Sequence, residues 1–154
     1  MKARLDDHLA KAPAAIKALM ALEAALKGSS LETGLLELVK LRASQINGCA
    51  YCIHMHATSL RKSGESDMRL YLLDAWREAP HYTARERAAL AWTERLTRLS
   101  ETDIEEAEYE ILEAAFTPEE QVNLTLAIGA INVWNRLQVG FAVPPPFSED
   151  THGA

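Results

Sequence analysis

The chain has 154 residues, enough for one hydrophobic core, and we expect a single domain spanning residues 1–154. Hydrophobic residues make up 48% of it and charged residues 25%, a balance typical of a soluble globular protein and not of a disordered one. The formal net charge of −6 disfavours nucleic acid and anionic membranes as partners, because both recruit basic surfaces.

The N-terminal residues turn acidic after Arg4 and lack the apolar stretch of a secretory signal, which indicates a cytoplasmic protein. The cytoplasm keeps thiols reduced. A cysteine pair there is therefore more often catalytic, redox-sensing or metal-binding than a permanent crosslink.

Apolar residues recur with helical spacing along most of the chain, and no stretch shows the alternation of a strand. Breaks at glycine, proline and Asn-Gly divide this pattern into seven segments. The predicted helices are about 13–27, 33–46, 49–63, 66–78, 84–96, 104–116 and 118–141. The sequence therefore predicts an all-α, single-domain helical bundle.

Two helix starts carry recognisable caps. Thr83 and Glu86 have the spacing of a capping box, and Thr117 precedes a proline that fits the first helical position. The last helix is apolar on most of its circumference but has too many polar side chains to span a membrane comfortably. We expect other subunits of a homo-oligomer to cover part of it, and a poorly ordered tail over about 144–154.

Both cysteines of the chain lie in one short motif, Cys49-Ala-Tyr-Cys52-Ile-His54-Met-His56. On a helix, Cys49, Cys52 and His56 fall within roughly 60° of one another. The preceding Asn-Gly turn places the cysteines at a helix start, where backbone N–H groups and the helix dipole stabilise a thiolate. His56, four residues after Cys52, can exchange a proton with its sulfur.

A disulfide within this motif is expected to be labile. Cβ atoms three residues apart on a helix are about 5–6 Å apart, whereas a disulfide needs about 3.8 Å, so closing the bond requires distortion at the helix end. So short a loop also adds little stability. A redox pair is therefore favoured over incidental buried thiols and over a zinc site, for which His54, His8, His81 and His152 are the further candidate ligands.

With this motif, the chain resembles the carboxymuconolactone decarboxylase-like superfamily, and specifically its alkyl hydroperoxidase D-like branch. The pattern of that branch is a glutamate, eleven residues, then Cys-x-x-Cys-x-x-x-His, and Glu37, Cys49, Cys52 and His56 meet it. The resemblance continues through residues 36–52, 85–94 and 130–136. It implies an all-helical fold assembled into trimers or hexamers.

The resemblance also implies the roles of the four residues, with neither cofactor nor metal. Cys52 would attack a peroxide and become a sulfenic acid, Cys49 would resolve it to a disulfide, and His56 with Glu37 would relay protons. From spacing alone, Glu37 fits a solvated polar stripe of its helix better than a catalytic site. The branch has a histidine between its cysteines, where this chain has Tyr51.

The function expected from these residues is a thiol-dependent peroxidase, reducing hydrogen peroxide or organic hydroperoxides and serving antioxidant defence. An external dithiol, thioredoxin-like or lipoyl, would regenerate it. A lactone decarboxylase of aromatic catabolism is an alternative, although that branch generally lacks the cysteine pair. A zinc-bound or redox-sensing helical module without enzymatic activity is another. Trp92, Trp134 and Tyr71 are expected in the core or in an interface, outside the site.

Overall fold

The protein is described from a computed structural model, which covers residues 2–101 and 103–146. These residues form seven α-helices and two short 3₁₀-helices, and they contain no strand. The α-helices are α1 Pro13–Lys27, α2 Thr33–Ile46, α3 Ala50–Lys62, α4 Asp67–Tyr71, α5 Ala84–Thr97, α6 Glu106–Ala115 and α7 Pro118–Gly140. The all-α prediction is confirmed. Most of the expected tail, residues 147–154, lies outside the described residues.

The predicted caps form as expected. Thr83 and Glu86 make a reciprocal capping box at the start of α5, and Thr117 with Glu120 makes another at the start of α7. Pro118 occupies the first turn of α7, where its missing N–H leaves no intrahelical bond unmade. Gly64 follows the end of α3 with a φ of 95°, a conformation that favours glycine.

The structure differs from the prediction between residues 66 and 78. The expected single helix is split into α4 and a 3₁₀-helix, Leu73–Ala75. Leu70, Leu73 and Trp76 are all buried at a spacing of three residues. That spacing matches the three-residue turn of a 3₁₀-helix, so the split keeps all three side chains in the core. A second 3₁₀-helix, His8–Lys11, precedes α1 and was not predicted.

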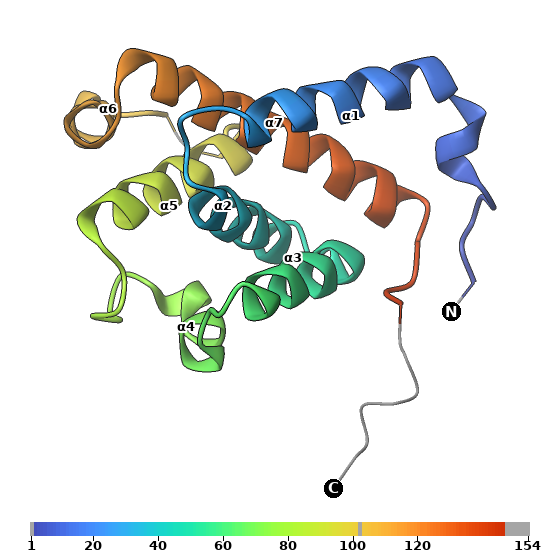
Figure 1. The fold of residues 1–154 in the computed structure, drawn as a ribbon, viewed down its shortest axis with the longest axis horizontal. Coiled ribbons are helices and arrows are strands. Elements are labelled where there is room, and N and C mark those ends of the chain that lie inside the picture. The colour runs from blue at the N-terminus through green and yellow to red at the C-terminus, as the bar shows by residue number, and fades with distance from the viewer. Residues whose placement is uncertain (1, 102, 147–154) are drawn as a thin grey trace, which may run out of the picture.

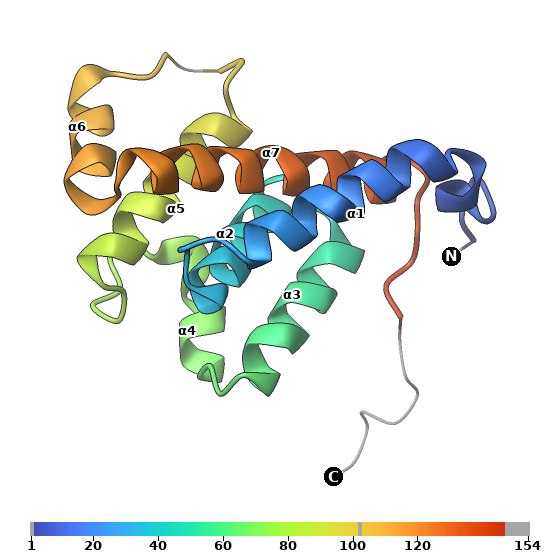
Figure 2. The same ribbon diagram turned by 45° about the horizontal axis from the view of Figure 1, so that its top comes forward.

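Helix α2 runs through the middle of the molecule. Figures 1 and 2 place it between α1 and α7 on one side and α3 and α4 on the other, and it packs directly against α3, α5 and α7. Leu36 and Val39 join the apolar cluster shared with α1, α5, α6 and α7, while Leu38 and Leu41 join the cluster with α3, α4 and α5. A polar stripe of α2, formed by Glu37, Lys40 and Ser44, lies between these two apolar faces.

Helix α7 is buried along one face and open along another. Leu124, Ile128 and Ile131 are in the core, whereas four of its apolar side chains are exposed in the single chain. The exposed ones are Val122, Leu126, Val133 and Val139. This face agrees with the oligomer expected from the sequence, which stays a prediction.

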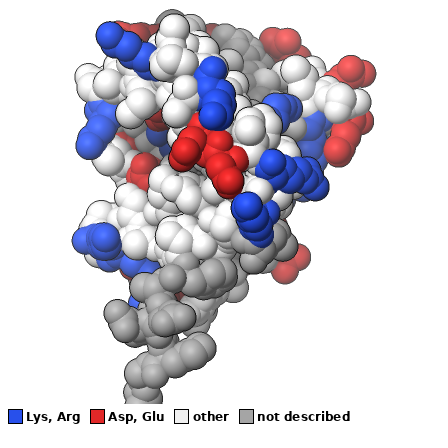
Figure 3. Space-filling view, turned by 90° about the vertical axis from the view of Figure 1, so that its right-hand side faces the viewer, with Lys and Arg blue, Asp and Glu red and all other residues white. Residues whose placement is uncertain are grey.

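The described helices do not include one that is both long enough and apolar enough to cross a membrane. Figure 3 shows the face at the right-hand side of Figure 1, where acidic and basic side chains are interspersed. On this face, neither charge gathers into one large patch.

Candidate active site

The cysteine motif begins at a sharp turn between α2 and α3. Gly48 has a φ of 64°, which reverses the chain after Asn47, and the Cys49 N–H donates to the Ser44 carbonyl over 3.0 Å. Cys49 is the N-cap of α3, with its sulfur accepting from the Cys52 N–H at 3.3 Å. The prediction that the cysteines stand at a helix start is confirmed.

The two cysteines are joined by a disulfide, with Cα atoms 5.3 Å apart. Because Cys49 has an extended backbone just before α3, the bond forms at the helix end without interrupting the helix. Both residues are only 1% exposed. A reductant or substrate must therefore reach the sulfur atoms through an opening in the fold.

A histidine and a glutamate from different helices meet beside this disulfide. His56 on α3 lies with its Nδ1 2.9 Å from Oε2 of Glu37 on α2. Burial raises the pKa of the Glu37 carboxyl, but the interaction with His56 and the charge of Lys40 lower it by more, so the net pKa is below its usual value. Glu37 is therefore ionised at neutral pH.

The hydrogen bond with Glu37 determines which ring nitrogen of His56 can accept a proton. A carboxylate can only accept, so Nδ1 donates, and in the neutral ring Nε2 then carries a free lone pair. This Nε2 is buried and has no hydrogen-bond partner among the described residues. His56 follows Cys52 by one helical turn, so Nε2 is suited to take a proton from the thiol in the reduced protein.

A cavity of about 540 Å³ opens onto these groups. Cys52, His56 and Glu37 line it, whereas Cys49 is not among its lining residues. Most of the remaining wall is apolar, contributed by α1, α2, α3, α7 and the first 3₁₀-helix. The apolar lining residues are Leu9, Ile16, Met20, Ala24, Leu36, Met55 and Trp134. Cys52, and not Cys49, therefore borders this cavity.

Residues 13–95, more than half of the chain, match the model of the carboxymuconolactone decarboxylase family. This chain belongs to the carboxymuconolactone decarboxylase family. The uncharacterized protein YdfG of Bacillus subtilis (strain 168) is 39% identical over 128 residues, covering 83% of this chain and 87% of YdfG.

Solved structures similar to this family member share its fold. A protein of unknown function from Agrobacterium tumefaciens, named for an AhpD-type role in antioxidant defence, is 45% identical with a TM-score of 0.90. The match covers 96% of this chain and 100% of that one. An uncharacterized peroxidase-related protein from Silicibacter sp. is 29% identical, with a TM-score of 0.77 over 90% of this chain and 72% of that one. The AhpD-like fold expected from the sequence is confirmed.

In this carboxymuconolactone decarboxylase family member, the polar stripe of α2 is not a solvated face. Lys40 is 9% exposed and pairs with Glu23 of α1, and Ser44 is fully buried. The interpretation of Glu37 as part of a solvated stripe is therefore wrong. Its polar neighbours are covered by partners on α1 and α7, which the local spacing within α2 cannot reveal.

Sequence reasoning missed one aromatic residue of the cavity. Trp134, expected in the core or an interface, lines the cavity and donates from Nε1 to Glu23 over 3.1 Å. The resemblance of residues 130–136 to the family was the one signal that this segment matters. Trp92 packs against the core as expected, whereas Tyr71 is 75% exposed in the single chain and so is not a core residue; its place in an interface stays a prediction.

Two further side chains of the motif, His54 and Tyr51, have different surroundings. His54 is exposed on the surface, and Tyr51, half-buried, lines the cavity. Residues 2–101 and 103–146 hold no group of three or more histidine, cysteine or acidic side chains placed to bind one metal ion.

Proposed function

We propose that this protein is a thiol-dependent peroxidase in which Cys52 attacks the peroxide and Cys49 resolves the sulfenic acid that forms on Cys52. The observation that carries the proposal is the placement of Cys52 on the cavity wall, next to the hydrogen-bonded His56 and Glu37, with Cys49 already joined to it. The names of the Agrobacterium and Silicibacter proteins support the same chemistry.

The cycle starts from the reduced dithiol. His56 Nε2 takes the proton of Cys52, and the thiolate, stabilised by the α3 N-terminus, attacks one oxygen of the peroxide. The O–O bond breaks, the departing alkoxide takes the proton from His56, and Cys52 becomes a sulfenic acid. Cys49 then attacks the Cys52 sulfur, and hydroxide leaves with the Cys49 proton as water. One hydroperoxide and two thiols give one alcohol, one water and one disulfide.

Two further parts of the proposal concern partners. The cavity volume and its apolar wall favour an organic hydroperoxide over hydrogen peroxide, which would fill little of the space. An external dithiol, thioredoxin-like or lipoyl, returns the disulfide to two thiols by exchange and is itself oxidised. We place this chemistry in the cytoplasm and in antioxidant defence, within a homo-oligomer.

A peroxide panel tests the proposed function. Hydrogen peroxide, tert-butyl hydroperoxide and cumene hydroperoxide are each supplied with dithiothreitol, dihydrolipoamide or reduced thioredoxin, and peroxide loss is followed. We expect consumption that requires both the protein and a dithiol, with kcat/KM highest for an organic hydroperoxide. Protein alkylated at both thiols is the control. No consumption above that control with any pair, in protein whose disulfide the dithiol has reduced, would reject a peroxidase.

A further inference from the structure

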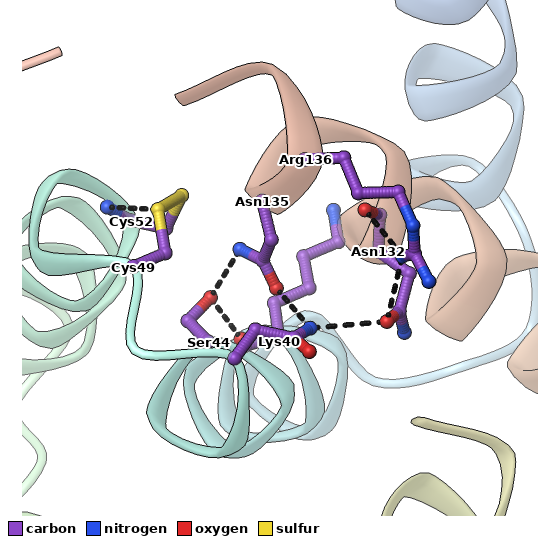
Figure 4. The surroundings of a disulfide bond; sticks show 8 residues. Lys40, Ser44, Cys49, Cys52, Asn132, Asn135 and Arg136 are labelled. Atoms are coloured by element: carbon purple, nitrogen blue, oxygen red, sulfur yellow. Dashed lines mark hydrogen bonds between the residues drawn. A yellow bond between two sulfur atoms is a disulfide. The ribbon is translucent and has the colours of Figure 1, made fainter. Parts of the chain in front are cut away.

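A cluster of polar side chains, three of them amides, lies near the disulfide where α7 packs against the end of α2. It consists of Ser44 and Asn47 from the C-terminal end of α2 and Asn132 and Asn135 from α7, and we call it the amide cluster. Figure 4 shows Asn135 reaching from α7 to Ser44 beside the cysteines. None of its members is needed for the proton transfers described above.

Asn135 makes the central contacts of the amide cluster. Its Nδ2 donates to the Ser44 hydroxyl over 3.0 Å, and its Oδ1 accepts from Asn47 Nδ2 over 2.9 Å. The same Asn47 amide also donates to Asn132, at 3.0 Å. Asn135 therefore holds both ends of the segment from Ser44 to Asn47 with a single side chain.

This segment determines where Cys49 lies. The Ser44 carbonyl accepts the Cys49 N–H, and Asn47 is followed directly by the left-handed Gly48. Only one residue, Gly48, therefore separates the part of the chain held by Asn135 from Cys49. By contrast, Cys52 lies within α3, three residues beyond the capping residue Cys49.

The amide cluster fills part of the core but adds little to the stability of the fold. Asn135 is 1% exposed and Ser44 is fully buried, and polar groups there gain little over an apolar side chain of similar size. What the hydrogen bonds add is a fixed orientation of the groups that they join. A buried polar network whose atoms have hydrogen-bond partners, as Nδ2 and Oδ1 of Asn135 do here, specifies one geometry of the groups it joins.

We propose that Asn135 is a positioning residue of the dithiol, which holds Cys49 where its thiol closes onto Cys52 and so favours the disulfide. The proposal rests on the thiol cycle of the proposed function. The equilibrium between dithiol and disulfide depends on the effective concentration of one thiol at the other. Releasing Ser44 and Asn47 lets Cys49 explore other positions, which lowers that concentration and weakens the disulfide relative to an external one.

The test measures the disulfide equilibrium in glutathione redox buffers, without peroxide. Asn135→Ala is expected to lower the equilibrium constant for disulfide formation about tenfold, which corresponds to a reduction potential about 30 mV higher. Ser44→Ala removes one of the two partners of Asn135. It is expected to lower the equilibrium constant for disulfide formation as well, but by less than tenfold. Thr93→Val is the matched control, because Thr93 is also fully buried and its hydroxyl donates within α5, away from the turn.

The stabilities of the oxidised and reduced forms, from urea unfolding, give an independent readout. Thermodynamic linkage requires Asn135→Ala to destabilise the oxidised protein more than the reduced one if it shifts the equilibrium, whereas Thr93→Val should affect both equally. If Asn135→Ala does not fold, Ser44→Ala and Asn47→Ala decide the question. An unchanged equilibrium constant in the folded variants overturns the proposal. A shifted constant in a protein that consumes no peroxide would support the positioning role while rejecting the peroxidase.

Discussion

Replacing Cys52 with serine is expected to abolish dithiol-dependent peroxide turnover, leaving only the rate of the uncatalysed reaction. A serine hydroxyl in this environment is not ionised and cannot take the oxygen that a thiolate takes. Cys49→Ser is the matched variant, because both side chains are equally buried and the change in size is the same. Without added thiol, the reduced Cys49→Ser protein is expected to consume one peroxide per chain and then stop, because no second thiol is present to resolve the sulfenic acid.

The two variants are compared by steady-state peroxide consumption and by mass spectrometry after trapping with dimedone. The dimedone adduct is expected on Cys52 in Cys49→Ser protein. An adduct on Cys49 in Cys52→Ser protein, together with retained single turnover, would reverse the two roles. Full turnover in Cys52→Ser protein would show that the reaction does not require the cysteine pair.

Glu37→Gln is expected to lower kcat/KM about 10²-fold or more, the usual contribution of a positioned acid–base group. Glutamine has the shape of glutamate but no charge, and its amide can turn either its oxygen or its NH₂ toward His56, so it no longer fixes Nδ1 as the donor. Glu23→Gln is the matched control. Glu23 lines the same cavity but pairs with Lys40 and Trp134, and we expect a change of less than about fivefold there.

The pH dependence separates the charge of Glu37 from its shape. Because its pKa in the folded protein lies below the ordinary value, the carboxylate and its contribution persist at and above that value and are lost only as the pH falls through the lowered pKa. The ratio of wild-type to Glu37→Gln kcat/KM should therefore be constant from pH 8 down to about pH 5. A ratio of wild-type to Glu37→Gln kcat/KM near one throughout that range would show that Glu37 does not belong to the proton relay.

Local signals in the sequence were sufficient for most of the helices and for the cysteine turn. Caps such as Thr83 with Glu86, and the Asn47-Gly48 break, act within a few residues, so their effect can be predicted without tertiary contacts. The prediction of a single helix over 66–78 was wrong, because burial of Leu73 and Trp76 against other helices overrode the local helical preference.

The site was predictable only in part, for a related reason. Cys52 and His56 lie on one helix and Cys49 caps it, so helical periodicity was enough to predict that the three side chains lie close together. Glu37 comes from another helix, and only the family pattern linked it to His56. Trp134 and Asn135 lie more than 75 residues from the motif, beyond the matched residues 13–95, and no spacing within α7 indicates which of its polar or aromatic side chains face the cysteines.

The most direct test of the account is a single-turnover thiol count. The protein is reduced, freed of reductant, mixed with one equivalent of cumene hydroperoxide, and its free thiols and cross-linked peptides are measured. We predict that one equivalent of the alcohol appears, that both thiols are lost, and that the Cys49–Cys52 disulfide forms. Peroxide left intact by fully reduced protein, or consumed while both thiols stay free, would contradict the account.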